Sequence, residues 1–284
     1  MIKNILITIF FCSVTLFAKT NIIVSILPQK TFVQKIGGEL VTVEVMVMPG
    51  SSPATYEPKP SQMRNLSKSE LYFSIGVAFE QTWLKKFKNQ NSKLTIVDSA
   101  KGVEKRVFKS SHSHRDHRGI KDPHIWLSPK LVKIQVKNIL NALVKIDKKN
   151  QDIYEKNYQN FIKEINILDD KIKNIFKTLP KNRNFMVFHP TWGYFADDYG
   201  LVQMPIEIEG REPKFSELKK FIEKARKNSV KVIFVQKEFS SKMAKVIAKE
   251  AGAKVVKVSP LSPDWAKNLE IIAKIFVSNL KPNE

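Results

Sequence analysis

The feature that most constrains the fold is one long amphipathic stretch in the middle of the chain, from Asp147 to Leu179. Its apolar side chains recur at alternate spacings of four and three residues, which places them on one face of an α-helix. They are Tyr154, Tyr158, Phe161, Ile165, Leu168, Ile172, Ile175 and Leu179. At 1.5 Å per residue this helix would extend about 45 Å. That is longer than one small domain requires, so we expect it to join two lobes.

Short strand and helix patterns alternate on both sides of this helix. The alternation predicts an α/β fold, with two α/β lobes whose sheets are mainly parallel, joined by one long rigid helix. We place the N-terminal lobe at 19–147, the linking helix at 148–180 and the C-terminal lobe at 181–284. The strands are expected at 21–26, 41–48, 71–75, 94–97, 185–188, 201–208, 230–235 and 254–258.

The first 18 residues have the pattern of a secretory signal peptide. Lys3 precedes an apolar run over residues 5–17, and Ala18 supplies a small residue for cleavage. The apolar run is too short to span a bilayer comfortably. We therefore expect a periplasmic protein cleaved near Ala18. The single cysteine, Cys12, lies inside this leader, so the mature chain would have neither disulfides nor thiolate metal ligands.

The charge is strongly basic, with 48 Lys and Arg against 27 Asp and Glu. Such an excess raises nucleic acid as a partner. However, the lysines are spread over nearly every expected helix and alternate with acidic residues, and no Arg-rich arm is present. We therefore interpret the charge as a solvated basic surface and expect no nucleic-acid partner.

Histidine is rare and concentrated, which favours a metal site. Four of the five histidines fall within residues 112–124, and the fifth, His189, follows an expected strand. His124 precedes a helix whose start is marked by Ser128 and Pro129. Side chains on loops that follow parallel strands collect at one edge of the sheet, which adds Asp264 as a candidate. Imidazole and carboxylate are suitable zinc ligands.

Each candidate ligand also has a purely structural interpretation. His124 could hydrogen-bond a turn, His189 could be a core histidine, and Asp264 could be the N-cap of the last helix. The remaining histidines, His112, His114 and His117, lie in a polar loop at 111–121. That loop is either an accessory metal-capturing segment or simply solvated.

Several motifs together resemble the solute-binding proteins of zinc and manganese ABC importers, the ZnuA-like or TroA-like group. The motifs occur in the family's order over nearly all of the expected mature chain. They are Pro49-Gly50, Tyr56-Glu57-Pro58, Asp122-Pro123-His124-Ile125-Trp126-Leu127-Ser128-Pro129, Phe188-His189, Gly193-Tyr194-Phe195, Tyr199-Gly200-Leu201, Glu209-Gly210-Arg211-Glu212-Pro213, and Asp264-Trp265 before Asn268. A short His-rich insert is typical of the zinc members.

The resemblance implies a metal ion held between two lobes by His124, His189 and Asp264. The family's first ligand is a histidine in the Pro-His-x-Tyr-Glu-Pro motif, but Ala54 occupies that position here. The remaining donor could be water, Glu57 or a histidine of the 111–121 loop. Two imidazoles favour zinc over manganese.

The resemblance further implies a binding protein without a reaction of its own, which serves an inner-membrane ABC permease and is expected to be monomeric. Because of Ala54, the same fold could instead bind manganese, copper, nickel or a metal complex. A periplasmic zinc hydrolase is the alternative from another class. For that role Glu57, Glu209 and Glu238 are the candidates for a general base. No residue argues for or against an adhesin.

Overall fold

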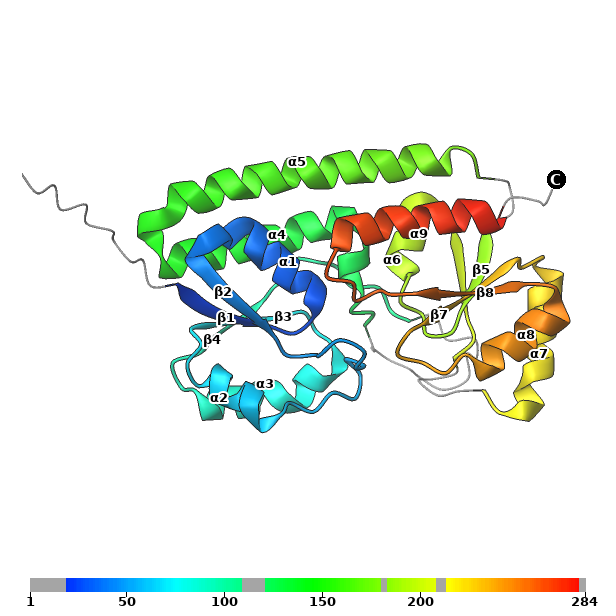
Figure 1. Ribbon diagram of the computed structural model, residues 1–284, viewed down its shortest axis with the longest axis horizontal. Helices are drawn as coiled ribbons and strands as arrows, with labels where there is room; N and C mark the ends of the chain where they lie inside the picture. Colours follow the sequence, from blue (N-terminus) through cyan, green and yellow to red (C-terminus); the bar gives the residue numbers. More distant parts are fainter. Residues whose placement is uncertain (1–18, 109–120, 180–182, 208–212, 281–284) are drawn as a thin grey trace, which may run out of the picture.

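The computed structural model describes residues 19–108, 121–179, 183–207 and 213–280, which form two α/β lobes (Figure 1). The expected leader and the loop histidines lie outside these residues. In the first lobe four parallel strands have the order β2-β1-β3-β4. The elements are β1 (Thr20–Val24), α1 (Leu27–Gly37), β2 (Val41–Val45), α2 (Pro60–Leu66), β3 (Leu71–Ser74), α3 (Ala78–Gln90) and β4 (Thr95–Asp98).

The second lobe repeats this topology, with the strand order β6-β5-β7-β8 and parallel pairing throughout. The predicted two-lobed α/β fold is therefore confirmed. The elements are β5 (Asn184–Val187), α6 (Gly193–Tyr199), β6 (Val202–Pro205), α7 (Phe215–Lys227), β7 (Val232–Gln236), α8 (Lys242–Ala251), β8 (Lys254–Val258) and α9 (Trp265–Leu280).

The long central helix is real but shorter than predicted. Asp147 ends helix α4 (Pro129–Ile146), and its carboxylate accepts hydrogen bonds from Asn150 and Tyr154. A 3-10 turn at Lys148–Asn150 follows, and α5 occupies Gln151–Phe176. Its 26 residues correspond to about 39 Å. The difference arises because Asp147 holds a turn between α4 and α5 and does not cap α5.

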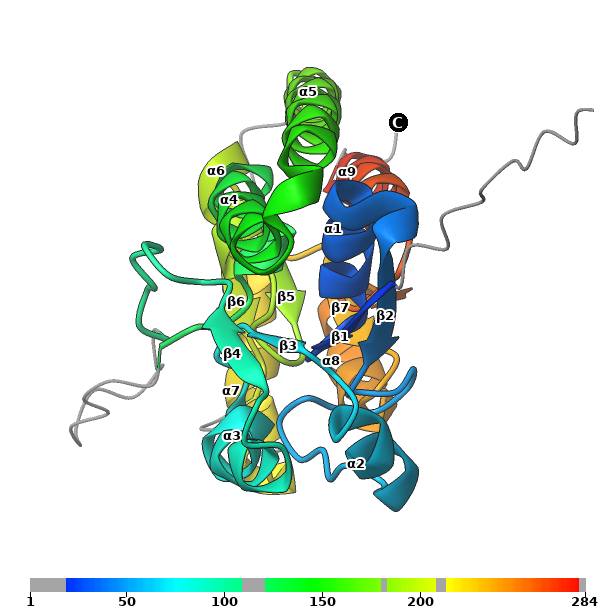
Figure 2. The ribbon, with the colours of Figure 1, turned by 90° about the vertical axis from the view of Figure 1, so that its left-hand side faces the viewer.

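Helix α5 lies across both lobes, as its length requires. It packs against α1 and α4 of the first lobe and against α9 of the second (Figure 1). Seen from the end, α5 forms an outer layer over α4, α1 and α9, while α2, α3 and α7 lie on the opposite side of the sheets (Figure 2).

One buried apolar cluster includes side chains of both lobes and of α5. Within it, Phe276 of α9 lies with its ring centroid 4.6 Å from that of Phe234 and 4.7 Å from that of Phe185. This continuous core fixes the two lobes relative to one another.

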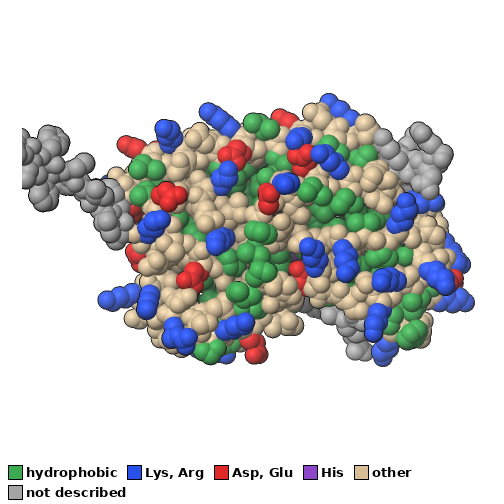
Figure 3. Space-filling model, viewed as in Figure 1, with side chains coloured by type: hydrophobic (Ala, Val, Ile, Leu, Met, Phe, Trp, Pro, Cys, Tyr) green, Lys and Arg blue, Asp and Glu red, His purple; other side chains and the backbone are tan. Residues whose placement is uncertain are grey.

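The face of the molecule shown in Figure 3 agrees with the distributed charge expected from the sequence. On the face shown in Figure 3, Lys and Arg side chains are spread over both lobes, and acidic and apolar side chains lie between them. Among the described residues, no helix is both long enough and apolar enough to cross a membrane.

Candidate metal centre

The segment that carries His124 is fixed by the elements that follow it. A buried 3-10 turn, Ile125–Leu127, leads directly into α4, where the Ser128 hydroxyl accepts a hydrogen bond from the Leu131 amide as the N-cap. The indole of Trp126 donates to the Pro260 carbonyl of the other lobe at 2.8 Å. Because this turn is held in the lobe interface, the His124 side chain is buried there, with the residue 7% exposed.

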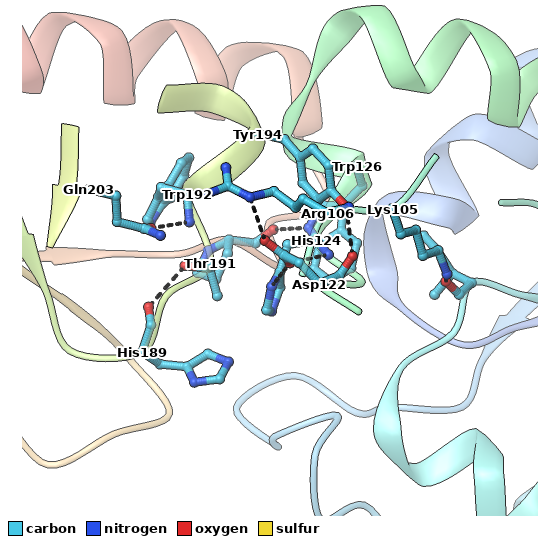
Figure 4. Close-up of polar contacts among 12 residues, drawn as sticks. Lys105, Arg106, Asp122, His124, Trp126, His189, Thr191, Trp192, Tyr194 and Gln203 are labelled. Carbon is cyan, nitrogen blue, oxygen red and sulfur yellow. Dashed lines mark hydrogen bonds and ion pairs between the residues drawn. The ribbon is translucent and has the colours of Figure 1, made fainter. Parts of the chain in front are cut away.

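Asp122 holds the His124 ring by its Nδ1 atom. Its Oδ1 lies 2.7 Å from that nitrogen and also accepts the His124 amide at 3.0 Å. Its other oxygen lies 3.9 Å from the guanidinium of Arg106 (Figure 4). The same guanidinium also pairs with Asp197 of α6 at 2.6 Å. Burial lowers the pKa of His124 from its ordinary value, although Asp122 opposes this shift. The ring is thus kept neutral and oriented.

His189 has a matching arrangement in the second lobe. It lies on the loop after β5, and its Nδ1 is 2.7 Å from Oε2 of Glu207, which follows β6. Gln236, at the end of β7, donates to the His189 carbonyl. The imidazole stacks on Phe239, with 5.3 Å between ring centroids and 22° between planes. The histidine is therefore fixed by three strand ends and an aromatic wall.

The two imidazoles face each other across the lobe interface. Their ring centroids are 5.3 Å apart and their planes are 76° to one another. Neither Nε2 atom has a hydrogen-bond partner among the described residues. A carboxylate on Nδ1 fixes the tautomer and makes the other ring nitrogen a better metal donor. Both rings carry this feature, so His124 and His189 can act as a pair of neutral nitrogen ligands.

A cavity of about 150 Å³ adjoins the histidine pair. In the first sheet the strand order reverses between β1 and β3, and in the second between β5 and β7. Ligand sites of open parallel sheets occur at such switch points. The cavity lies beside the switch points of both sheets. It is lined by Ser52, Pro53, Ala54, Gly76, Val77, Ala78, Gln81, Phe108, Lys121, Pro123, His124, Trp126, His189, Thr191, Gln236, Glu238, Phe239, Pro260 and Leu261.

A buried carboxyl group supports the first-lobe wall of this cavity. Glu80 of α3 accepts hydrogen bonds from the Ile75 and Gly76 amides and from the Ser25 hydroxyl. Burial raises its pKa to about 6. Gly76 has a φ of 91°, and a Cβ there would lie 2.3 Å from Nζ of Lys105. The positive φ is what favours glycine at this turn after β3, since the Lys105 side chain is flexible and could move away from a Cβ.

The structure brings together some of the predicted ligands and not others. Ala54 lines the cavity beside the two histidines, which agrees with its place in the first motif. Glu57 and Asp264 are exposed and do not line the cavity, and the Asp264 carbonyl accepts the first amide bond of α9 from Asn268. Within the described ranges, no group of three or more His, Cys, Asp or Glu side chains is arranged to hold a metal.

Two carboxylates of the site were not assigned a role from the sequence. Asp122 stands two residues before His124, so its position in a tight turn was the available signal. Glu207 lies two residues after β6 and 18 residues from His189. Because the strand ends of a parallel sheet lie at one edge, an acidic residue just after an expected strand deserved inclusion. Glu238, a candidate general base, lines the cavity. The remaining candidates, Glu209 and the three loop histidines, lie outside the described residues.

Comparison with known proteins gives a consistent family relationship. Residues 22–280 match the sequence model of ZnuA, the periplasmic component A of the zinc-uptake complex. The high-affinity zinc uptake system protein ZnuA of Bacillus subtilis (strain 168) is 30% identical over 248 residues, which cover 83% of this chain and 76% of the relative. The manganese ABC transporter substrate-binding lipoprotein PsaA of Streptococcus pneumoniae is 27% identical, over 87% of this chain and 76% of PsaA.

Solved structures show the same likeness. A crystal structure of a ZnuA deletion mutant with zinc bound superimposes with a TM-score of 0.87 at 42% sequence identity, covering 94% of this chain and 100% of that one. The likeness therefore extends over both lobes.

Proposed function

This chain belongs to the ZnuA family of metal-binding ABC-transporter solute-binding proteins, and we propose that it captures a divalent transition metal ion, with zinc favoured, and delivers it to an ABC importer. The observation that carries the proposal is the pair of imidazoles at the lobe interface, each with Nδ1 held by a carboxylate at 2.7 Å. His124 and His189 are the proposed protein ligands.

The donor set favours zinc as cargo. Neutral imidazole nitrogen is a good ligand for zinc, copper and nickel, whereas manganese prefers oxygen donors. The two carboxylates in contact with the histidines, Asp122 and Glu207, are engaged by the rings. They therefore orient nitrogen ligands and do not form an oxygen-rich site.

The site performs binding rather than catalysis in this proposal. The two carboxylates nearest to the histidines hold Nδ1–H groups, so neither is free to take a proton from a metal-bound water. The continuous core below α5 predicts little hinge closure. Release to the permease would then require a small change of ligand geometry. A periplasmic location and an inner-membrane permease partner complete the proposal.

Titration of purified, metal-free protein with zinc, manganese, copper and nickel, each against a competing chelator, tests this function. We expect zinc to bind more tightly than manganese, and His124→Ala and His189→Ala each to weaken zinc binding strongly. Asp264→Ala and Glu57→Ala test whether either carboxylate moves toward the cavity to bind. Unchanged zinc affinity in both histidine variants would refute the assignment.

A further inference from the structure

The cavity beside the histidine pair is larger than a metal ion requires. One water molecule occupies about 30 Å³ in the liquid, whereas the cavity measures about 150 Å³. An ion with one or two bound waters would leave most of this volume to be filled. The space is sufficient for a small organic molecule next to the metal.

The cavity walls have the chemistry of a ligand pocket. Apolar side chains form most of the surface, with the rings of Phe108, Trp126 and Phe239 around the two histidines and Val77 and Ala54 on the first-lobe side. Phe108 lies with its ring centroid 6.1 Å from that of His124. Pockets that bind organic ligands combine such walls with a few polar groups. A hydrated ion alone would leave this apolar surface against water.

The described protein donors complete only half of a zinc shell. Zinc in proteins is usually four-coordinate, and the histidine pair supplies two nitrogens. Glu238 also lines the cavity, but among the described residues no third His, Cys, Asp or Glu side chain is placed with the pair to hold one ion. Ala54, at the family's first ligand position, lines the cavity and has no donor atom. The two further positions would therefore be filled by groups that enter the cavity.

The carboxylates beside the histidines are already engaged. Asp122 and Glu207 each hold the Nδ1 atom of an imidazole at 2.7 Å, and Arg106 is shared between Asp122 and the closer Asp197. A co-ligand that brings its own anionic oxygen donor would leave both of these contacts in place.

We propose that the cargo is a metal complex, in which a divalent ion held by His124 and His189 carries a bidentate amino-carboxylate of amino-acid size. Its amine and carboxylate occupy the two remaining coordination positions, and its side chain lies against the rings of Phe108, Trp126 and Phe239. This inference rests on the proposed function, since it uses the same histidine pair.

The test is native mass spectrometry with zinc titration, using zinc alone, zinc with millimolar L-leucine, and zinc with N-acetyl-L-leucine. The acetylated compound keeps the carboxylate and side chain but has no amine to chelate. We expect a complex of protein, zinc and one leucine, with zinc binding at least about tenfold tighter than with zinc alone, a gain of 1.4 kcal/mol. N-acetyl-L-leucine should have no effect.

Two substitutions of the exposed residue Ala54 separate the effect of filling the cavity from the effect of adding a ligand atom. Ala54→Leu adds bulk without a donor and should abolish the complex with leucine. Ala54→His adds a donor and should bind zinc tightly without leucine. Equal zinc affinity with and without leucine, and no leucine in the complex, would overturn the inference but leave the proposed function. Loss of zinc-only binding on combined His112→Ala, His114→Ala and His117→Ala would also overturn it. No zinc binding under any condition would overturn both proposals.

Discussion

Replacing Glu207 by Gln should weaken zinc binding without unfolding the protein. The carboxylate accepts the Nδ1–H of His189 at 2.7 Å, and its side chain is 8% exposed. The amide has nearly the same shape, so the packing is retained. However, it has no charge, and its NH₂ group can turn toward Nδ1, which would favour the tautomer that protonates Nε2 and blocks the metal.

The size of this effect follows from the hydrogen bond that is changed. A bond to a charged group contributes about 1.5–3 kcal/mol and a neutral one about 1 kcal/mol. We therefore expect a loss of about 1–2 kcal/mol, which is about a 5- to 30-fold rise in Kd. This agrees with the 10- to 100-fold effects typical of groups that orient metal ligands.

The assay is competitive zinc titration against a fluorescent chelator, with thermal unfolding of the metal-free protein to check the fold. Glu238→Gln is the matched control, because Glu238 lines the same cavity but has no described hydrogen bond to either imidazole. An unchanged Kd in Glu207→Gln, or an equal loss in Glu238→Gln, would refute the role given to Glu207.

Three further results are expected. Zinc affinity should fall as the pH drops below about 6.5 because imidazole must be neutral to bind. Burial lowers the pKa of His124, so that ring should stay neutral to a lower pH than free histidine. Calorimetric zinc titrations that do not change with pH would contradict this prediction. Because the pKa of Glu80 is raised from 4.5 to about 6 on folding, its contribution to the free energy of unfolding is fully present below pH 4.5 and is lost as the pH rises through 6. Urea denaturation should thus show wild type losing roughly 2 kcal/mol relative to Glu80→Gln between pH 4.5 and 7, and a constant difference would count against it. Phe276→Ala should lower the free energy of unfolding by about 3–5 kcal/mol, since the ring is fully buried among Phe185, Phe234 and other aromatic rings. A loss under about 1 kcal/mol in the same assay would show that the core shared by the two lobes contributes less to stability than its packing indicates.

The sequence was most informative where local patterns determine structure. Ser128 and Pro129 identified the start of α4, and strand-helix alternation predicted both sheets, because these signals depend on near neighbours along the chain. The same reasoning failed at Asp147, which could cap either the preceding or the following helix. Contacts with Asn150 and Tyr154 decide between these, and such contacts depend on the three-dimensional turn.

The site itself could be predicted only in part. His124 and His189 were found because they are rare side chains in distinctive motifs, whereas Glu207 is one of many acidic residues near a strand end. Its pairing with His189 depends on β5 and β6 being neighbours in the sheet. Loop position and the Asp264-Trp265 motif both predict Asp264 as a ligand. In the structure its side chain is exposed, and the loop after β8 places Pro260 and Leu261 against the cavity.

The proposed function requires that zinc is bound by two imidazoles, those of His124 and His189. Zinc X-ray absorption spectroscopy, on protein loaded in imidazole-free buffer, counts them directly. We expect two imidazoles per zinc at about 2.0–2.1 Å, no sulfur, and one imidazole in His189→Ala. A spectrum without imidazole scattering, or one that is the same in wild type and His189→Ala, would contradict the account.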